Sequence, residues 1–222
     1  MTPLGEPIAH QARGLVYGNR GCLHDAAGEI RRFHDGRRWI ACRLTFRDWN
    51  RGPLMQPGRF TEPFFLDEAT ALAAGHRPCA LCRRADHQRL HAVWQGVYPG
   101  ACTADAIDAR LHAERLDPSG RRRLHGVQAA LLPDGAFWMW RGRPHLVLGE
   151  RLLRWTPSGY DGAERRPAAG HVDAVTPPSL MAVLAAGWSP LVEHLHQSAA
   201  RWARLGVRSQ RPAEQPSGGH GE

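Results

Sequence analysis

A pair of cysteines separated by two residues, Cys79 and Cys82, constrains the fold of this chain more than any other feature of its sequence. The pair follows a short predicted helix, which Asp67 caps and Gly75 ends, and precedes a segment with helical spacing over residues 85–94. Two thiolates one turn apart can grip a single tetrahedral zinc ion. A redox pair of the thioredoxin type has the same spacing but follows a strand in a βαβ unit, so the context favours zinc over redox chemistry. Two ordinary buried thiols are the remaining interpretation.

A third cysteine, Cys42, lies in residues 38–47, where apolar and polar residues alternate. This alternation predicts a half-buried strand with Cys42 on its apolar face. The chain has five cysteines, and residues 1–13 lack the apolar run of a secretory signal. We therefore expect a cytoplasmic protein whose cysteines bind metal or act as reactive thiols rather than forming disulfides. No stretch approaches the roughly 18 apolar residues of a membrane-spanning helix, so no membrane partner is expected.

Residues 64–83, with the sequence FFLDEATALAAGHRPCALCR, combine an aromatic strand end, an Ala-rich helix, a glycine stop, Arg-Pro and both thiols. In this order of features, over about residues 60–84, the chain resembles the second half of the metal-binding N-terminal domain of the Ada DNA-alkylation repair family. The resemblance implies a zinc ion bound by four thiolates. It also implies that the first cysteine of an upstream Cys-x3-Cys pair accepts a methyl group from a DNA phosphotriester.

The upstream pair of that family is broken in this chain, because Phe46 stands four positions after Cys42. One ligand of the family pattern is therefore missing or has moved. A tight turn presents Cys22 and His24 together. The expected metal ligands are Cys42, Cys79, Cys82 and Cys22, with His24 or His34 as alternatives for the fourth position.

All the positively charged residues counted at neutral pH are arginines. There are 29 basic and 21 acidic residues, which give a net charge of +8, and the sequence contains no lysine. This excludes Schiff-base chemistry and the phosphate-binding P-loop, both of which need a lysine. Arginine suits bidentate phosphate contacts and stacking on bases, so DNA is the expected partner, although replacement of lysine in a GC-rich genome also explains the composition. The candidate nucleic-acid contacts are Arg20, Arg77, Arg83, Arg84, Trp138 and Trp140.

The second half of the chain predicts a different organisation. Thr103 is a candidate cap for a helix, residues 131–155 have the turns and alternation of a β-meander, and helices are expected at residues 178–186 and 190–205. We expect an α+β fold, in which a small zinc-containing α/β module packs on a helical portion with a β-meander. The expected divisions are a flexible arm (1–13), an Ada-like zinc-binding module (14–98), the helical and β-meander portion (99–207) and a disordered tail (208–222).

Three functions fit these features. The leading hypothesis is a zinc-containing DNA-binding protein that recognises or repairs damaged DNA. The second is a zinc-dependent enzyme acting on nucleobases or nucleic acid, of deaminase, glycosylase or nuclease type. Zinc deaminases combine an H-x-E triplet with P-C-x-x-C, and this chain has both, in reversed order. The candidate catalytic residues are Glu114, from that triplet, and the adjacent His24 and Asp25. The third is a non-catalytic, zinc-stabilised interaction protein, so the sequence leaves open whether the chain is an enzyme.

Overall fold

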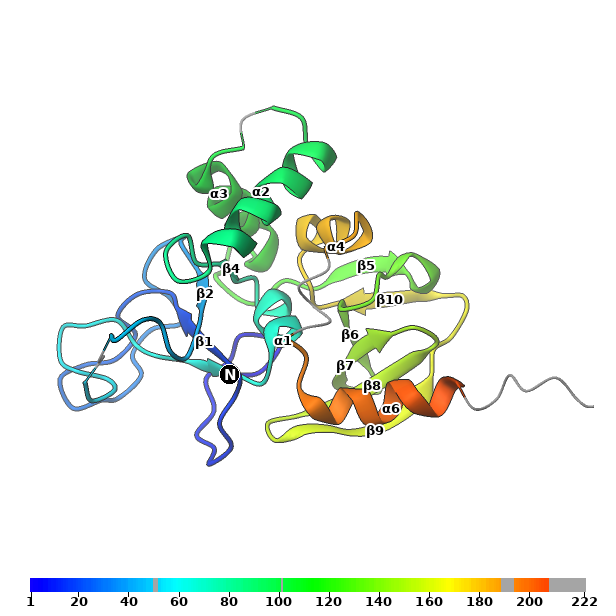
Figure 1. Ribbon diagram of the computed structural model, residues 1–222, viewed down its shortest axis with the longest axis horizontal. Coiled ribbons are helices and arrows are strands. Elements are labelled where there is room, and N and C mark those ends of the chain that lie inside the picture. Colours follow the sequence, from blue (N-terminus) through cyan, green and yellow to red (C-terminus); the bar gives the residue numbers. More distant parts are fainter. Residues whose placement is uncertain (50–51, 101, 189–193, 208–222) are drawn as a thin grey trace, which may run out of the picture.

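The computed structural model describes residues 1–49, 52–100, 102–188 and 194–207 of the chain. Helices account for 25% and strands for 24%, arranged as two sheets with helices packed on them, so the predicted α+β class is confirmed. The small sheet and the large sheet lie side by side, with α1 (Glu68–Ala73) between them (Figure 1). The predicted disordered tail, residues 208–222, lies outside the described residues.

The small sheet consists of four short strands from the first half of the chain. They are β1 (Val16–Asn19), β2 (Ile40–Cys42), β3 (Phe64–Phe65) and β4 (Arg77–Pro78). Their order is β3-β1-β2-β4, with β2 and β4 parallel and the other pairs antiparallel.

The strand predicted over residues 38–47 is shorter in the structure, where β2 ends at Cys42. The reason lies in the next residue, because the backbone N–H of Arg43 donates to Cys82 Sγ at 3.4 Å instead of continuing the ladder. Arg47 then has a φ of 51°, which takes the chain out of the extended region.

Three helices follow or connect these strands: α1 (Glu68–Ala73), α2 (Arg84–Val97) and α3 (Ala104–Arg115). The predicted caps are confirmed, since Thr70 N donates to Asp67 Oδ1 at 2.9 Å and Ala106 N donates to Thr103 Oγ1 at 3.2 Å. Gly75 ends the first helix at a φ of 83°, a left-handed conformation that costs glycine no strain.

The large sheet has six antiparallel strands in the order β5-β10-β6-β7-β8-β9. The β-meander predicted over residues 131–155 corresponds to β6, β7 and β8, and in the structure it continues beyond the predicted range into β9. The turn at Arg141 and Gly142 has positive φ at both residues, as a two-residue hairpin requires. The strands are β5 (His125–Gln128), β6 (Phe137–Trp140), β7 (Arg143–Leu148), β8 (Arg151–Thr156), β9 (Gly159–Arg165) and β10 (His171–Ala174), with a 3-10 turn η1 (Ala129–Leu131) after β5.

Two further helices follow: α4 (Pro178–Ala185), which contacts α2 and α3, and α6 (Gln197–Val207), which packs on β9. The first agrees with the prediction, whereas the second begins later than residue 190, and residues 189–193 lie outside the described part. Residues just before α6 bind α1 instead of forming helix: His196 N donates to Asp67 Oδ2 at 3.2 Å, and Glu68 N donates to the carbonyl of His194 at 3.3 Å.

One hydrophobic core connects the two halves of the chain. It includes Leu72 of α1, Leu90 of α2 and Leu111 of α3 together with Phe137 and Leu153 of the large sheet. The sequence left open whether the halves share a core, and the structure shows that helices of the first half pack directly against the second.

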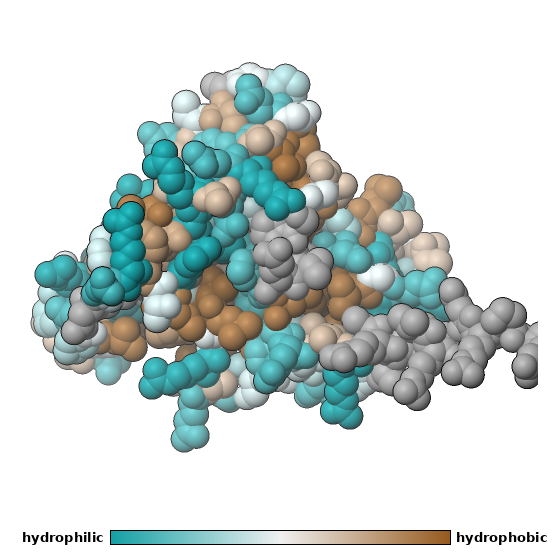
Figure 2. Space-filling model, viewed as in Figure 1, coloured by the Kyte–Doolittle hydropathy of each residue, from teal (hydrophilic) through white to brown (hydrophobic). Residues whose placement is uncertain are grey.

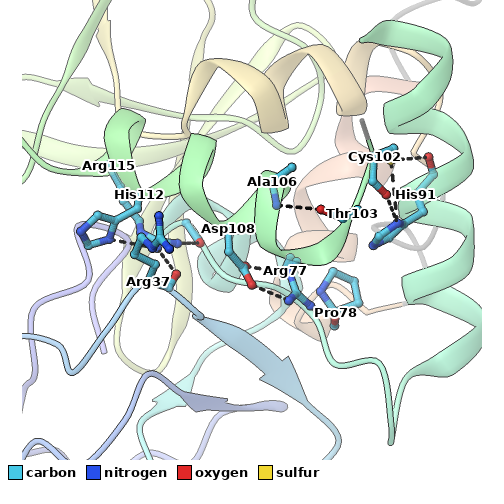
Figure 3. Close-up of polar contacts among 11 residues, drawn as sticks. Arg37, Arg77, Pro78, His91, Cys102, Thr103, Ala106, Asp108, His112 and Arg115 are labelled. Atoms are coloured by element: carbon cyan, nitrogen blue, oxygen red, sulfur yellow. Dashed lines mark hydrogen bonds and ion pairs between the residues drawn. The ribbon is translucent and has the colours of Figure 1, made fainter. Parts of the chain in front are cut away.

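A buried ion pair fixes the edge of the small sheet to α3. Arg77 donates through Nε and Nη2 to Asp108 Oδ1 and Oδ2 at 2.8 and 2.6 Å (Figure 3). The two side chains are 3% and 4% exposed. A bidentate pair of this kind satisfies both groups in the interior, so β4 has a fixed position relative to α3.

Truncating Asp108 tests this anchor. The variant Asp108→Ala leaves the Arg77 guanidinium buried without its counter-charge, so the free energy of unfolding should fall by about 3–5 kcal/mol. Urea unfolding followed by tryptophan fluorescence measures it. The matched variant Asp35→Ala breaks the exposed pair with Arg32 and should change little. An Asp108 variant as stable as the Asp35 variant would contradict the anchoring role.

Two further buried arginines lie over the ring of Trp39. The guanidinium carbons of Arg115 and Arg20 are 4.0 and 4.7 Å from the ring centroid. Arg20 Nη2 donates to the carbonyl of Gly5 at 2.8 Å, and Arg115 Nη1 donates to that of Gly75 at 2.7 Å. The pKa of each guanidinium is lowered to about 9, mainly by burial and in part by the charge of Arg122, and at Arg115 the nearby Asp108 opposes this shift. Carbonyl oxygens and an aromatic face thus stabilise these cations in the interior.

His76 is buried beside these cations, with its ring 4.6 Å from that of Phe65 and 5.3 Å from that of Trp39. Burial, followed by the charges of Arg20 and Arg115, lowers the pKa of His76 well below its usual value. The folded protein therefore keeps this imidazole neutral.

Acid should destabilise the fold through His76. The unfolded chain takes up this proton near pH 6.5, whereas the folded chain does not, so the free energy of unfolding falls as the pH drops from about 7 to about 5. The variant His76→Phe keeps an aromatic ring and should make this decline shallower. Unfolding at several pH values measures the difference from the wild type. The exposed control His171→Phe should leave the slope unchanged, and equal slopes for all three proteins would refute the assignment.

Candidate metal centre

The parallel pairing of β2 and β4 brings two distant cysteines to the same end of the small sheet. Ala41 pairs with Pro78, so the residues that follow them, Cys42 and Cys79, lie next to each other. The N–H of Cys79 donates to the carbonyl of Ala41 at 3.0 Å, which fixes this proximity through the backbone.

The turn after β4 adds the third thiol. Arg83 N donates to the carbonyl of Cys79 at 3.1 Å, which curls the chain so that Cys82 turns back toward the first two cysteines. The three Sγ atoms of Cys42, Cys79 and Cys82, named here the thiol cluster, lie within 4.8 Å of one another. All three cysteines are buried, with 7–8% of their surface exposed, and none is in a disulfide.

The electrostatics of the thiol cluster favour a bound cation. Hydrogen bonds with Cys42 and then Cys82 lower the pKa of Cys79, whereas hydrogen bonds with Cys79 and then Cys82 raise the pKa of Cys42. Backbone N–H groups also donate to sulfur, from Leu81 to Cys79 and from Arg43 to Cys82, both at 3.4 Å. Three thiolates this close repel one another, so all three can ionise together only around a positive ion. The cluster can therefore hold a metal ion, and its sulfur ligands suit a soft or borderline one.

Two buried arginines flank the turn formed by residues 79–82, named here the cysteine turn. Arg77 precedes it and pairs with Asp108 of α3. Arg83 follows it and pairs with Glu68 of α1 at 2.6 Å and with Asp86 of α2 at 2.7 Å. Both guanidinium groups are buried, so they position the turn.

The other expected metal ligands lie apart from the thiol cluster. The thiol of Cys22 donates to the carbonyl of His24 at 3.5 Å. The ring of His24 is engaged at both nitrogens, with Thr61 Oγ1 at 2.6 Å and the Gln56 carbonyl at 3.2 Å. The ring of His34 packs on Trp39 and His112 at 5.7 and 5.0 Å. Within the described residues the group that could hold a metal ion thus consists of three cysteines, and Phe46 packs against it where the Ada pattern has a cysteine.

A cavity of about 350 Å³ borders the thiol cluster. Tyr17, which pairs with Cys42 across β1 and β2, stands in its wall. The remaining lining comes largely from residues 49–62, a turn-rich segment without periodicity. The lining residues are Tyr17, Asn19, Ile40, Cys42, Trp49, Gln56, Arg59, Phe60, Glu62, Cys79, Leu81 and Cys82. The sequence pattern did not identify Trp49, Phe60 or Arg59 as candidate site residues. The one indication in the sequence is that aromatic and basic residues occur together in this segment.

The residues expected to contact nucleic acid are mostly interior. Arg20, Arg77, Arg83 and Trp138 are buried, whereas Trp140 is half-buried with Nε1 donating to Glu164 at 3.1 Å. Arg84 is exposed at the start of α2. Hydrophilic residues gather over the part of the surface that carries α2 and α3 (Figure 2).

The candidate catalytic residues have structural contacts of their own. Glu114 accepts hydrogen bonds from the backbone N–H and the hydroxyl of Ser179, in the first turn of α4. Asp25 accepts from the N–H groups of Ala27 and Glu29 within its loop, and the hydrogen bond from Arg31 is the main cause that lowers its pKa. The described residues that line the thiol cavity include neither of these carboxylates, nor His24.

Comparison with protein-family models, curated proteins and solved structures finds no match to this chain. The helices within the described ranges are all too short or too polar to cross a membrane.

Substitution of single cysteines tests the metal centre. Because the cluster needs its three sulfurs, Cys42→Ser, Cys79→Ser and Cys82→Ser should each lose most of the metal that purifies with the wild type. Cys22→Ser and Cys102→Ser are matched controls and should retain it. The metal content per chain of each variant and of the wild type is measured by mass spectrometry. Loss of metal in the Cys22 variant would add that residue to the ligand set, and a metal-free wild type would contradict the centre.

Proposed function

We propose that this chain is a zinc-containing DNA-binding protein that recognises or repairs damaged DNA, with zinc held by Cys42, Cys79 and Cys82. The observation that carries this proposal is the thiol cluster at the edge of a cavity, because sulfur ligands in this number suit zinc and the cavity gives a partner access. The proposed role in DNA repair is taken from the resemblance of residues 60–84 to the Ada metal-binding domain.

The charge around the cavity supports a polyanionic partner. Arg59 lines the cavity, Arg43 follows Cys42, and Arg84 opens α2 just after Cys82; all three are exposed. The net charge of the chain is +8. Arginine binds phosphate through its planar fork, and such contacts release counterions from DNA.

The number of protein ligands favours a zinc-dependent enzyme as the second candidate. Structural zinc sites have four protein ligands, whereas catalytic sites have three and leave one position for substrate or water. Here three thiols border the cavity, and Glu62 contributes a carboxylate to the same lining. Bound zinc would supply a Lewis acid at this position, and Glu62 is placed to exchange protons with a group inside the cavity.

Salt dependence tests the DNA-binding proposal. The affinity of the zinc-loaded protein for a DNA oligonucleotide should fall linearly on a double-logarithmic plot against salt concentration, with a slope of about −0.7 to −0.9 per phosphate neutralised. Arg59→Gln and Arg84→Gln should each reduce the slope by about one such contact. Arg121→Gln removes an exposed arginine of the other half and is the matched control. A salt-independent affinity, or slopes that change only in the control, would refute the proposal.

A further inference from the structure

The cavity beside the thiol cluster combines flat apolar walls with amide and carboxylate groups. Tyr17 and Phe60 form one wall, with ring centroids 6.3 Å apart at an interplanar angle of 61°. Tyr17 is fixed by its strand, since it pairs with both Cys42 and Phe64. The volume of about 350 Å³ is within the roughly 300–1,000 Å³ range of ligand pockets.

Large apolar side chains are exposed at the rim of this cavity. Trp49 is 57% exposed, Leu81 52% and Phe60 37%. Trp49 is supported from one side by Phe46, whose ring centroid lies 5.7 Å away at 84°. Exposed apolar side chains that converge on one cavity are typical of a binding site, and aromatic rings there offer surfaces on which a planar ligand stacks.

The polar groups in the lining are held in place by the backbone. Asn19 Oδ1 accepts from the N–H of Gly21 at 3.0 Å, Gln56 Nε2 donates to the carbonyl of Pro53 at 2.9 Å, and Glu62 Oε2 accepts from the N–H of Met55 at 2.8 Å. Amide groups both donate and accept hydrogen bonds, as the edges of nucleobases do. The lining thus offers stacking surfaces and pre-oriented hydrogen-bonding groups at once.

We propose that this cavity receives an unstacked nucleobase of single-stranded DNA, with Trp49 and Phe60 as stacking surfaces and Arg59 on the adjoining phosphate. This proposal rests on the DNA-binding function proposed above, and it specifies single-stranded DNA as the form that binds. A base in a duplex is paired and stacked, so it reaches a cavity of this kind only after leaving the helix. Single-stranded DNA is therefore the better ligand.

A single-stranded oligonucleotide containing one fluorescent purine analogue provides the probe. Its fluorescence should change on binding to the zinc-loaded full chain, because the analogue exchanges stacking on its neighbours for stacking on protein rings. Trp49→Ala and Phe60→Ala should each weaken binding roughly 5- to 150-fold, the effect of losing one stacked base. The duplex of the same sequence should bind more weakly than the single strand.

One variant serves as the control. Leu131→Ala removes an apolar side chain that is 75% exposed in η1 of the other half of the chain. It should not change the affinity. Retained zinc in Trp49→Ala and Phe60→Ala shows that the thiol cluster is intact, so that weaker binding reports the cavity rather than loss of fold.

The outcomes separate this proposal from the one on which it rests. If the oligonucleotide binds in a salt-dependent way and the Trp49 and Phe60 variants bind as well as the wild type, the base pocket is refuted and DNA binding stands. Loss of binding in the Leu131 variant alone, or a duplex preferred over the single strand, would also refute the pocket. If the zinc-loaded wild type binds neither DNA form at low salt, both proposals are wrong.

Discussion

Buried ion pairs on either side of the cysteine turn are the constraint on which the rest of the structure depends. Arg77 ties β4 to α3 through Asp108, and Arg83 ties the beginning of α2 to α1 through Glu68. Since α1, α2 and α3 all contribute to the main hydrophobic core, these pairs connect the cysteine turn to that core. The cost of removing charges from water is met by bidentate or multiple contacts to carboxylates. The sulfur atoms therefore have defined positions even though the strands that carry them are only two or three residues long.

The features that the sequence predicted well are local ones. Asp67 and Thr103 cap their helices because a short side chain reaches the backbone of the next turn, and Gly75 ends α1 because it adopts a left-handed conformation. The proximity of Cys42 to the Cys-x-x-Cys turn was also expected, through the resemblance to the Ada domain. What the sequence could not show is which arginines find a buried carboxylate, because Asp108 stands 31 positions after Arg77.

The burial and position of the aromatic residues also depend on contacts between distant parts of the chain, which the sequence does not show. Alternation places Trp138 and Trp140 on one face of a strand, but it does not distinguish Trp138, which is completely buried in the main core, from Trp140, which is half-buried at its margin. Trp49 and Phe60 belong to a segment without periodicity, so no pattern predicts that they meet at the cavity beside the thiols. Both residues belong to the connection between β2 and β3, and they line the cavity together with Tyr17 and Cys42, which the pairing of β1 with β2 places opposite each other.

The parallel pairing of β2 with β4 has a consequence for the order of folding. Antiparallel neighbours can form as a hairpin, whereas this pair forms only after the whole segment between the strands, with β3 and α1 inside it, has been arranged. The three sulfurs therefore come together late in folding, after most of the conformational entropy of the segment between β2 and β4 has been lost. An ion captured at this stage would act as a latch, which slows unfolding more than it speeds folding.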